Sequence, residues 1–171
     1  MGCLGEYGLS YQDSYEKGVE YQDYIVKQLY QVGIPLVCFT SRKYQREGEN
    51  IAGFEIKFDD RMRETGNVYF ETAEKTDAGN KDFMASGIFR NDNTWLYVIG
   101  DYDTVYICGK AHLRHVYERE REKEESFARF TGTETSQGML LPQKYVEEQL
   151  AVKTLKIKPK SPWKEGVRPM G

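Results

Sequence analysis

Residues 54–58 read Phe-Glu-Ile-Lys-Phe, a strict alternation of apolar and charged side chains. Successive side chains of a β-strand point to opposite faces, so this pattern predicts a strand with one apolar and one charged face. Glu55 and Lys57 then share a face and lie ~6.6 Å apart along the strand. A carboxylate and an ammonium backed by three large apolar side chains are costly to keep in such a position unless they have a function.

A second carboxylate, Glu49, precedes Glu55 across a bend expected at residues 50–53. If the bend returns the chain, both carboxylates converge on Lys57. Carboxylate oxygens hold Mg²⁺ while leaving several of its waters in place, and a nearby lysine can orient a water and stabilise charge on a phosphate. The alternative is that Glu55 and Lys57 belong to the wet face of an amphipathic sheet, because Glu-x-Lys is a common tripeptide.

The composition indicates one folded domain. A chain of 171 residues has room for a hydrophobic core, and its aromatic content of 13% is too high for a disordered protein. The net charge of −3 does not indicate a strongly basic nucleic-acid-binding protein, although residues 153–168 are rich in lysine and arginine. We expect a single domain over residues 1–152 and a basic C-terminal tail over residues 153–171.

The cysteines and the hydropathy pattern bear on compartment. Cys3, Cys38 and Cys108 form no Cys-x-x-Cys or Cys/His cluster, so we expect no zinc site and interpret Cys38 and Cys108 as buried thiols. No signal peptide or transmembrane run is visible, and we expect a cytoplasmic protein without a membrane partner.

Hydrophobic periodicity and turn residues predict the order of elements. We expect one mixed β-sheet flanked by helices, an α/β or α+β domain in which the first helix packs behind the strands that carry the site. The predicted helices are residues 13–32, 111–127 and 142–152, the predicted strands are residues 34–40, 54–58, 67–72, 94–99 and 104–108, and residues 132–141 are predicted as a loop.

Residues 48–59, 69–75 and 95–101 follow the first helix and together resemble the PD-(D/E)XK nuclease superfamily, which has the restriction-endonuclease-like fold. The resemblance covers residues 17–113 and is strongest to small phage or prophage members. In that superfamily an acidic residue and a (D/E)-x-K tripeptide on two strands surround Mg²⁺. The resemblance implies that Glu55, Ile56 and Lys57 form the tripeptide, with the Ile56 carbonyl as an additional ligand of Mg²⁺ or Mn²⁺.

The same resemblance makes Glu49 the first acid, with Glu47 as the second choice, where members usually carry aspartate. Many members also have a glutamate on the first helix, and the corresponding position here is Gln22, beside Glu20 and Asp23. An amide can hydrogen-bond a water but adds no charge. These departures leave open a member that keeps the fold without cleaving.

Several further residues have two readings. Glu71 is either an additional carboxylate of the site or an exposed strand residue, and Lys75 is either a phosphate contact or a solvated lysine. Arg42, Lys43 and Arg46 precede the site and are candidates for contacts with the DNA backbone.

Features outside that set have simpler interpretations. We interpret His112 and His115 as helix-surface histidines, the acidic helix beginning near Glu118 as a solvated face, and Asp101 and Asp103 as caps of a tight turn.

The sequence therefore predicts metal-dependent hydrolysis of phosphodiester bonds in DNA, with Glu49 and Glu55 binding Mg²⁺ or Mn²⁺, Lys57 positioning the attacking water, and Gln22 steadying the site. A homodimer is a candidate assembly, because nucleases with one site commonly cleave a duplex as two copies. The alternatives are a non-catalytic nucleic-acid-binding module with the nuclease fold and a protein-interaction module.

Overall fold

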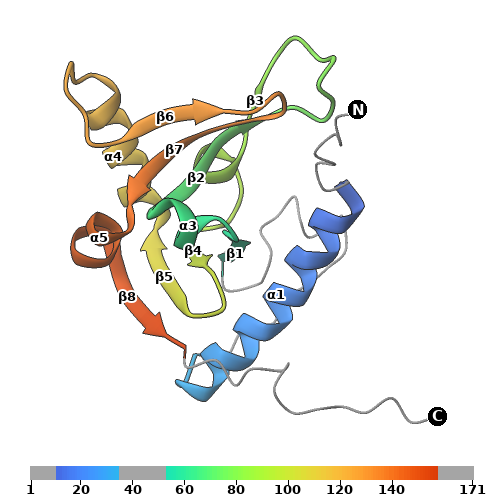
Figure 1. Cartoon of the computed structure of the whole chain (residues 1–171), viewed down its shortest axis with the longest axis vertical. Helices are drawn as coiled ribbons and strands as arrows, with labels where there is room; N and C mark the ends of the chain where they lie inside the picture. Colours follow the sequence, from blue (N-terminus) through green and yellow to red (C-terminus); the bar gives the residue numbers. More distant parts are fainter. Residues whose placement is uncertain (1–10, 35–52, 158–171) are drawn as a thin grey trace, which may run out of the picture.

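The structure is a computed structural model that describes residues 11–34 and 53–157, with side chains from residue 16 onward. Within these residues the strands form two four-stranded sheets, one mixed and one antiparallel (Figure 1). The predicted α+β class with a mixed sheet flanked by helices is confirmed. The second sheet lies beside the mixed one, and the space between them is where the charged face of residues 54–58 is found.

The mixed sheet contains the strand with the alternating pattern. Its order is β1-β4-β5-β8, in which β1 runs parallel to β4 and the other neighbours are antiparallel. A parallel pair needs a long crossover connection, and here that connection contains strands of the other sheet. The strands are β1 (Phe54–Phe58), β4 (Leu96–Gly100), β5 (Thr104–Gly109) and β8 (Ala151–Lys156).

The antiparallel sheet has the order β3-β2-β7-β6 and corrects one prediction. Residues 132–141, predicted as a loop, largely form β7, with Met139 and Leu141 buried. Gly138 made this segment look like a loop. The structure requires glycine there, because a Cβ would lie 2.4 Å from the ring of Tyr69. The strands are β2 (Asn67–Glu74), β3 (Met84–Ala85), β6 (Arg129–Gly132) and β7 (Ser136–Pro142).

Helix α1 (Tyr11–Gln31) covers one face of the mixed sheet, as predicted. Tyr21, Ile25 and Leu29 are spaced by one helical turn, are fully buried, and pack against the apolar side of β1 and β4. The next residue, Tyr30, is 72% exposed because it lies around the helix from Leu29, toward solvent. No helix in residues 11–34 and 53–157 is both long and apolar enough to cross a bilayer.

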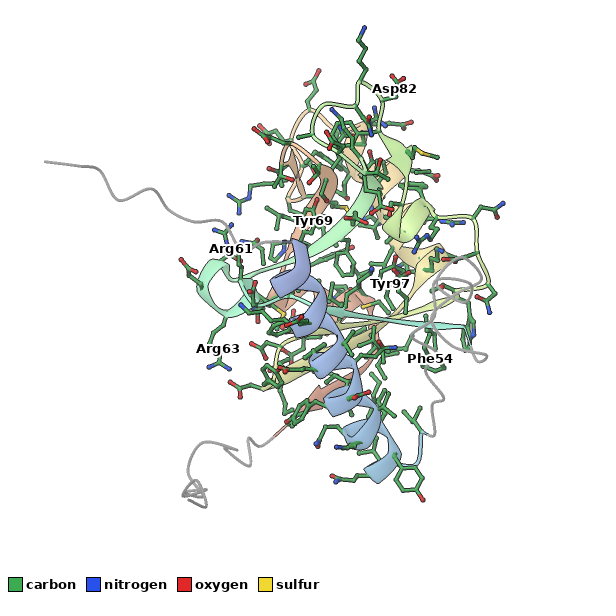
Figure 2. All side chains as sticks on the ribbon, turned by 90° about the vertical axis from the view of Figure 1, so that its right-hand side faces the viewer. Phe54, Arg61, Arg63, Tyr69, Asp82 and Tyr97 are labelled. Atoms are coloured by element: carbon green, nitrogen blue, oxygen red, sulfur yellow. The ribbon has the colours of Figure 1, made fainter. Side chains whose placement is uncertain are left out.

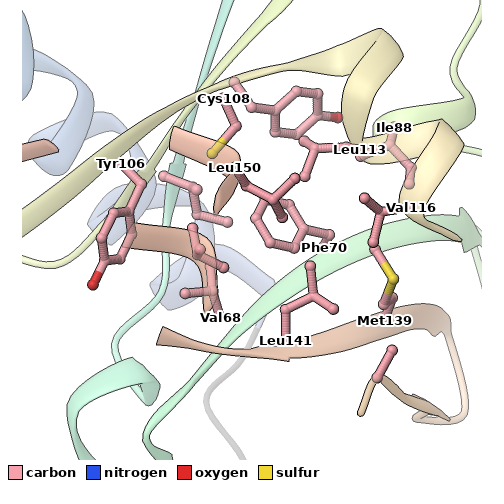
Figure 3. Close-up of a cluster of buried hydrophobic side chains, with 14 of the residues drawn as sticks. Val68, Phe70, Ile88, Tyr106, Cys108, Leu113, Val116, Met139, Leu141 and Leu150 are labelled. Carbon is pink, nitrogen blue, oxygen red and sulfur yellow. The ribbon is translucent and has the colours of Figure 1, made fainter. Parts of the chain in front are cut away.

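The other face of the mixed sheet forms the larger core with the antiparallel sheet and helix α4 (Figure 3). Phe70 and Met139 from the antiparallel sheet meet Leu113 and Val116 from α4 in this cluster. Cys108 is buried here, as predicted, and burial raises the pKa of its thiol to about 12. The mixed sheet is therefore apolar on both faces, except where β1 and β4 carry polar side chains between the sheets.

Helix α4 (Lys110–Arg121) is shorter than the predicted helix of residues 111–127. Its first residue is anchored, because Nζ of Lys110 lies 2.6 Å from Oδ1 of Asp92 and both side chains are buried. Glu120 is also fully buried, which corrects its assignment to a solvated face. Arg119, Lys123 and the Ser126 hydroxyl surround its carboxylate, and these partners hold its pKa below its ordinary value despite burial.

The segment after β7 confirms a short helix and then extends the sheet. Helix α5 (Gln143–Tyr145) continues as a π-helix, η2 (Val146–Leu150). Strand β8 pairs with β5 through Lys156, so residues 153–156 of the expected tail belong to the sheet. Residues 158–171 lie outside the described residues.

Two short turns close one end of the sheets. As predicted, Asp101 caps the β4–β5 turn, and its Oδ1 accepts the backbone N–H groups of Asp103 and Thr104. Arg63 from α3 (Met62–Thr65) makes ion pairs with Asp101 and Asp103. These contacts join the end of β1 to the β4–β5 turn.

A glycine in the connection between β3 and β4 brings two backbones together and provides a test of the fold. Gly87 begins the 3-10 turn η1 (Gly87–Phe89), has φ +49°, and a Cβ there would lie 2.1 Å from the carbonyl oxygen of Glu71. We predict that Gly87→Ala lowers the free energy of unfolding by about 3 kcal/mol in urea denaturation, because it adds a clash to a strained backbone.

Gly18 is the matched control. It lies within α1, and a Cβ there would meet no atom within 4 Å. Gly18→Ala should raise the free energy of unfolding by roughly 0.5–1 kcal/mol. Equal effects of the two substitutions would contradict the close approach at Gly87.

Candidate active-site cleft between the sheets

A cleft of about 630 Å³ lies between β1 and β4 of the mixed sheet and β2, β6 and β7 of the antiparallel sheet. Its walls combine basic, acidic, hydroxyl and aromatic side chains with few aliphatic ones. Figure 2 shows Arg61 at the α3 turn on one side of the molecule, with Tyr69 and Tyr97 nearer the middle. The described residues that line the cleft are Lys57, Phe58, Asp59, Asp60, Arg61, Thr65, Asn67, Tyr69, Glu71, Tyr97, Ile99, Arg129, Thr131, Gly132, Thr133 and Leu140.

Strand β1 places Glu55 and Lys57 on the face that looks away from α1. Ile56 belongs to the apolar cluster formed with α1, so the alternation predicted for this strand is confirmed. Nζ of Lys57 lies 2.9 Å from Oε1 of Glu55. The Glu55 side chain is 1% exposed, whereas that of Lys57 is 38% exposed and lines the cleft. The pair therefore has a buried anion at the back and a reachable cation in front.

The Glu55 carboxylate is poorly satisfied for a buried charge. Among the described residues, neither of its oxygens makes a well-directed hydrogen bond, although the Lys57 ammonium is close. A buried carboxylate normally accepts several such bonds, and leaving them unmade costs stability. Lone pairs kept open in this way are available to an oxygen-seeking cation.

Tyr97 stands beside Glu55 because β1 and β4 pair in parallel with these two residues opposite each other. The Tyr97 hydroxyl is buried close to the Glu55 carboxylate. Burial raises the pKa of Tyr97 far above its ordinary value, and the negative charges of Glu55, Asp92 and Glu71 raise it further. Hydrogen bonding between the phenol and Glu55 also contributes to the raised pKa, although the alignment of the two groups is poor. The phenol therefore stays protonated and can only act as a hydrogen-bond donor or a neutral acceptor.

Glu71 on β2 lies in the same cleft as Lys57, which favours its reading as a carboxylate of the site. Its two oxygens accept hydrogen bonds from the hydroxyls of Ser86 at 2.8 Å and Ser136 at 2.9 Å. Oγ of Ser136 also lies 2.7 Å from the Tyr69 hydroxyl, which must then donate, because the serine proton is directed to Glu71. A chain of hydroxyls thus fixes the orientation of this carboxylate.

Asp59 closes the end of the cleft next to α3. Its Oδ2 accepts the backbone N–H of Tyr69 at 2.9 Å, which links the end of β1 to β2. Burial raises the pKa of Asp59, and hydrogen bonds from the backbone N–H groups of Tyr69, Arg61 and Met62 partly offset this rise.

Of the predicted site residues in the described ranges, Lys57 lines the cleft and the other four do not: Glu55 and Ile56 are buried on β1, and Gln22 and Lys75 lie elsewhere. Gln22 lies on α1, which packs against the opposite face of β1, and it does not line the cleft. Lys75 lies beyond the end of β2, with its ammonium 4.4 Å from the ring centroid of Phe83. Glu49 and its alternative Glu47, together with Arg42, Lys43 and Arg46, lie outside the described residues and stay predictions, as does the strand predicted after Ile34.

The structure adds cleft residues that the sequence reasoning missed. Tyr97 lies at the cleft because β4 pairs in parallel with β1, and no local sequence pattern encodes this register. Arg129 and Thr131 alternate along β6, and the run Arg-Phe-Thr-Gly-Thr at residues 129–133 was the one available sign of this strand. His112 and His115 are exposed on α4, as predicted.

The expected Mg²⁺ or Mn²⁺ site stays a prediction. No group of three or more His, Cys, Asp or Glu side chains among residues 16–34 and 53–157 is arranged to hold a metal ion. Glu55 nevertheless has open carboxylate oxygens, and Glu71 has lone pairs beyond those that accept hydroxyl protons. Hard oxygen donors of this kind are of the type that Mg²⁺ or Mn²⁺ prefers.

Comparison of the chain with protein-family models, with curated proteins and with solved structures returned no match. The resemblance to the PD-(D/E)XK superfamily therefore continues to depend on the residues of the chain itself.

The unequal burial of Glu55 and Lys57 predicts opposite effects on stability. Glu55→Gln removes a buried charge while Lys57 keeps access to water. The free energy of unfolding of this variant should therefore be at least that of the wild type and up to about 1 kcal/mol higher. Lys57→Met leaves the Glu55 charge uncompensated and should lower the free energy of unfolding by about 2 kcal/mol. Urea denaturation at neutral pH measures both.

The double variant Glu55→Gln with Lys57→Met controls for lost packing. Its free energy of unfolding should be close to that of Glu55→Gln and above the value expected from the sum of the two single effects, because Lys57→Met costs stability only while the buried charge is present. Additive effects of the two substitutions would contradict a buried, charge-compensated pair.

The raised pKa of Asp59 predicts a pH-dependent difference in stability. The folded state holds the Asp59 proton more tightly than the unfolded chain, so this contribution is full below the ordinary pKa of 3.8 and is lost as the pH rises through the raised pKa. Asn cannot ionise, yet its side-chain oxygen can still accept the Tyr69 N–H. The stability of Asp59→Asn relative to wild type should therefore rise between about pH 3 and pH 6. Parallel pH profiles in thermal unfolding would contradict this assignment.

Proposed function

We propose that this chain is a Mg²⁺- or Mn²⁺-dependent hydrolase of phosphodiester bonds in DNA. The single observation that carries the proposal is the Glu55 carboxylate, which is 1% exposed, without well-directed hydrogen bonds from the described residues, and adjacent to a lysine that opens onto a cleft. Charged groups are rarely buried in this state unless a ligand or a reaction uses them.

The residues of the cleft have complementary roles in this reaction. A divalent cation bound by Glu55 and Glu71 would neutralise phosphate charge and lower the pKa of a water molecule. The Lys57 ammonium orients that water and stabilises the negative charge that develops on the phosphate oxygens. The protonated Tyr97 hydroxyl is a further donor at the floor of the cleft.

A specific observation favours a second candidate, a nucleic-acid-binding module that does not cleave. The first helix contributes no carboxylate to the cleft, since Gln22 lies on the helix that covers the opposite face of β1. Fewer carboxylates weaken the hold on a divalent cation. A DNA-cleavage assay separates the two candidates, because a binding module binds DNA without cleaving it.

Incubation of the purified full chain with linear, nicked and branched DNA and Mg²⁺ or Mn²⁺ tests the proposal. We expect metal-dependent cleavage that falls by at least about 10²-fold in Glu55→Gln and in Lys57→Met, because each removes charge needed in the transition state. Lys153→Gln is the control, since Lys153 is an exposed residue of β8 outside the cleft.

The cleavage rate of Glu55→Gln relative to the wild type is the decisive comparison, because this variant is expected to be at least as stable as the wild type. Cleavage that persists at the wild-type rate in this variant would refute the proposed roles. Metal-dependent DNA binding without any product from the wild type would favour the binding module instead.

A further inference from the structure

We infer that the cleft takes one unpaired strand of nucleic acid, with phosphates held by Arg129 from β6 and Arg61 from the start of α3. This inference rests on the proposed function and names the form of the substrate. An unpaired strand includes a frayed end, a flap or a single-stranded region.

The alternation of β6 directs Arg129 into the cleft. Arg129 and Thr131 both line it, whereas Phe130 between them faces the other side, where its ring centroid lies 5.3 Å from that of Tyr117 on α4. Packing of Phe130 against α4 therefore fixes which face of β6 the cleft receives. Thr133, next in this alternation, also lines the cleft and adds a hydroxyl donor.

Among the described residues, the two arginines of the cleft have no ion-pair partner. Within residues 16–34 and 53–157, neither Arg61 nor Arg129 makes a side-chain hydrogen bond or an ion pair, and both are exposed. Arg63 and Arg119, by contrast, pair with carboxylates. A guanidinium without a partner on the wall of a cleft is suited to bidentate binding of phosphate oxygens.

The depth and size of the cleft favour a single strand over a duplex. The reacting phosphate must approach Glu55, which is 1% exposed, behind Lys57 and beside the buried Tyr97. A volume of about 630 Å³ falls in the range of pockets that enclose small-molecule ligands, room for one or two nucleotides. A paired duplex is two strands broad, so a cleft with room for one or two nucleotides cannot take it in to that depth.

The charge balance of the cleft adds a second expectation. Lys57, Arg61 and Arg129 are matched by three acidic residues along the described lining, namely Asp59, Asp60 and Glu71. A strand of phosphates is attracted by the first set and repelled by the second. Divalent cations that neutralise the carboxylates should therefore strengthen binding of the strand.

Fluorescence anisotropy with a labelled single-stranded oligonucleotide and a blunt duplex of the same sequence tests the inference, using the full chain in EDTA and in Ca²⁺. We expect the single strand to bind roughly tenfold more tightly than the duplex, and more tightly in Ca²⁺ than in EDTA. Arg129→Gln should weaken single-strand binding by about tenfold. It should also reduce the slope of log affinity against log salt by about 0.7.

Arg121→Gln is the matched control, since Arg121 is an exposed arginine at the end of α4 and does not line the cleft. Duplex binding as tight as single-strand binding, or equal effects of Arg129→Gln and Arg121→Gln, would overturn the inference even if the chain cleaves DNA. Absence of cleavage with selective, Arg129-dependent binding of the single strand would refute the hydrolase alone and leave the strand-binding cleft standing.

Discussion

The burial of one carboxylate, that of Glu55, organises the site. Strand β1 must satisfy two opposite demands, because its apolar side chains pack under α1 while its charged side chains enter the space between the sheets. Burying a charge is tolerated only when compensation is close, and Lys57 supplies it at 2.9 Å. Tyr97, brought opposite Glu55 by the parallel pairing with β4, completes a small polar environment inside an otherwise apolar layer.

Local patterns were enough to predict the elements that depend on neighbouring residues. The helix that buries Tyr21, Ile25 and Leu29, the alternation of β1, and the turn capped by Asp101 all follow from spacing and side-chain chemistry within a few residues. The antiparallel sheet did not follow, because β7 contains a glycine that only the approach of Tyr69 explains. Its pairing with β2 joins segments that are distant in the chain, which single-sequence patterns do not encode.

In the candidate site, too, local patterns predicted some residues and not others. Glu55 and Lys57 could be predicted as a same-face pair, since a strand has a period of two. Glu71 reaches the same cleft only because the two sheets pack together, and Arg129 only because β6 is the neighbour of β7. The prediction that Gln22 belongs to the site shows a different problem. Its helix was correctly predicted, but the helix packs on the face of β1 that does not line the cleft. Helix and strand assignments thus do not determine which side chains meet.

Glu55 and Glu71 differ in the hydrogen bonds that their carboxylates accept. Glu71 already accepts two hydroxyl hydrogen bonds and is held through Ser136 by Tyr69, so its orientation is set before any ligand arrives. Glu55 lacks such bonds within the described part of the chain and is stabilised mainly by a lysine that can move toward solvent. In the proposed function a cation entering the cleft would gain most from Glu55, whose carboxylate is already desolvated in the folded protein, and Glu71 would then be a preoriented second ligand. The proposed reaction would then have its phosphate nearest β1, with the hydroxyl-rich wall of the antiparallel sheet opposite it.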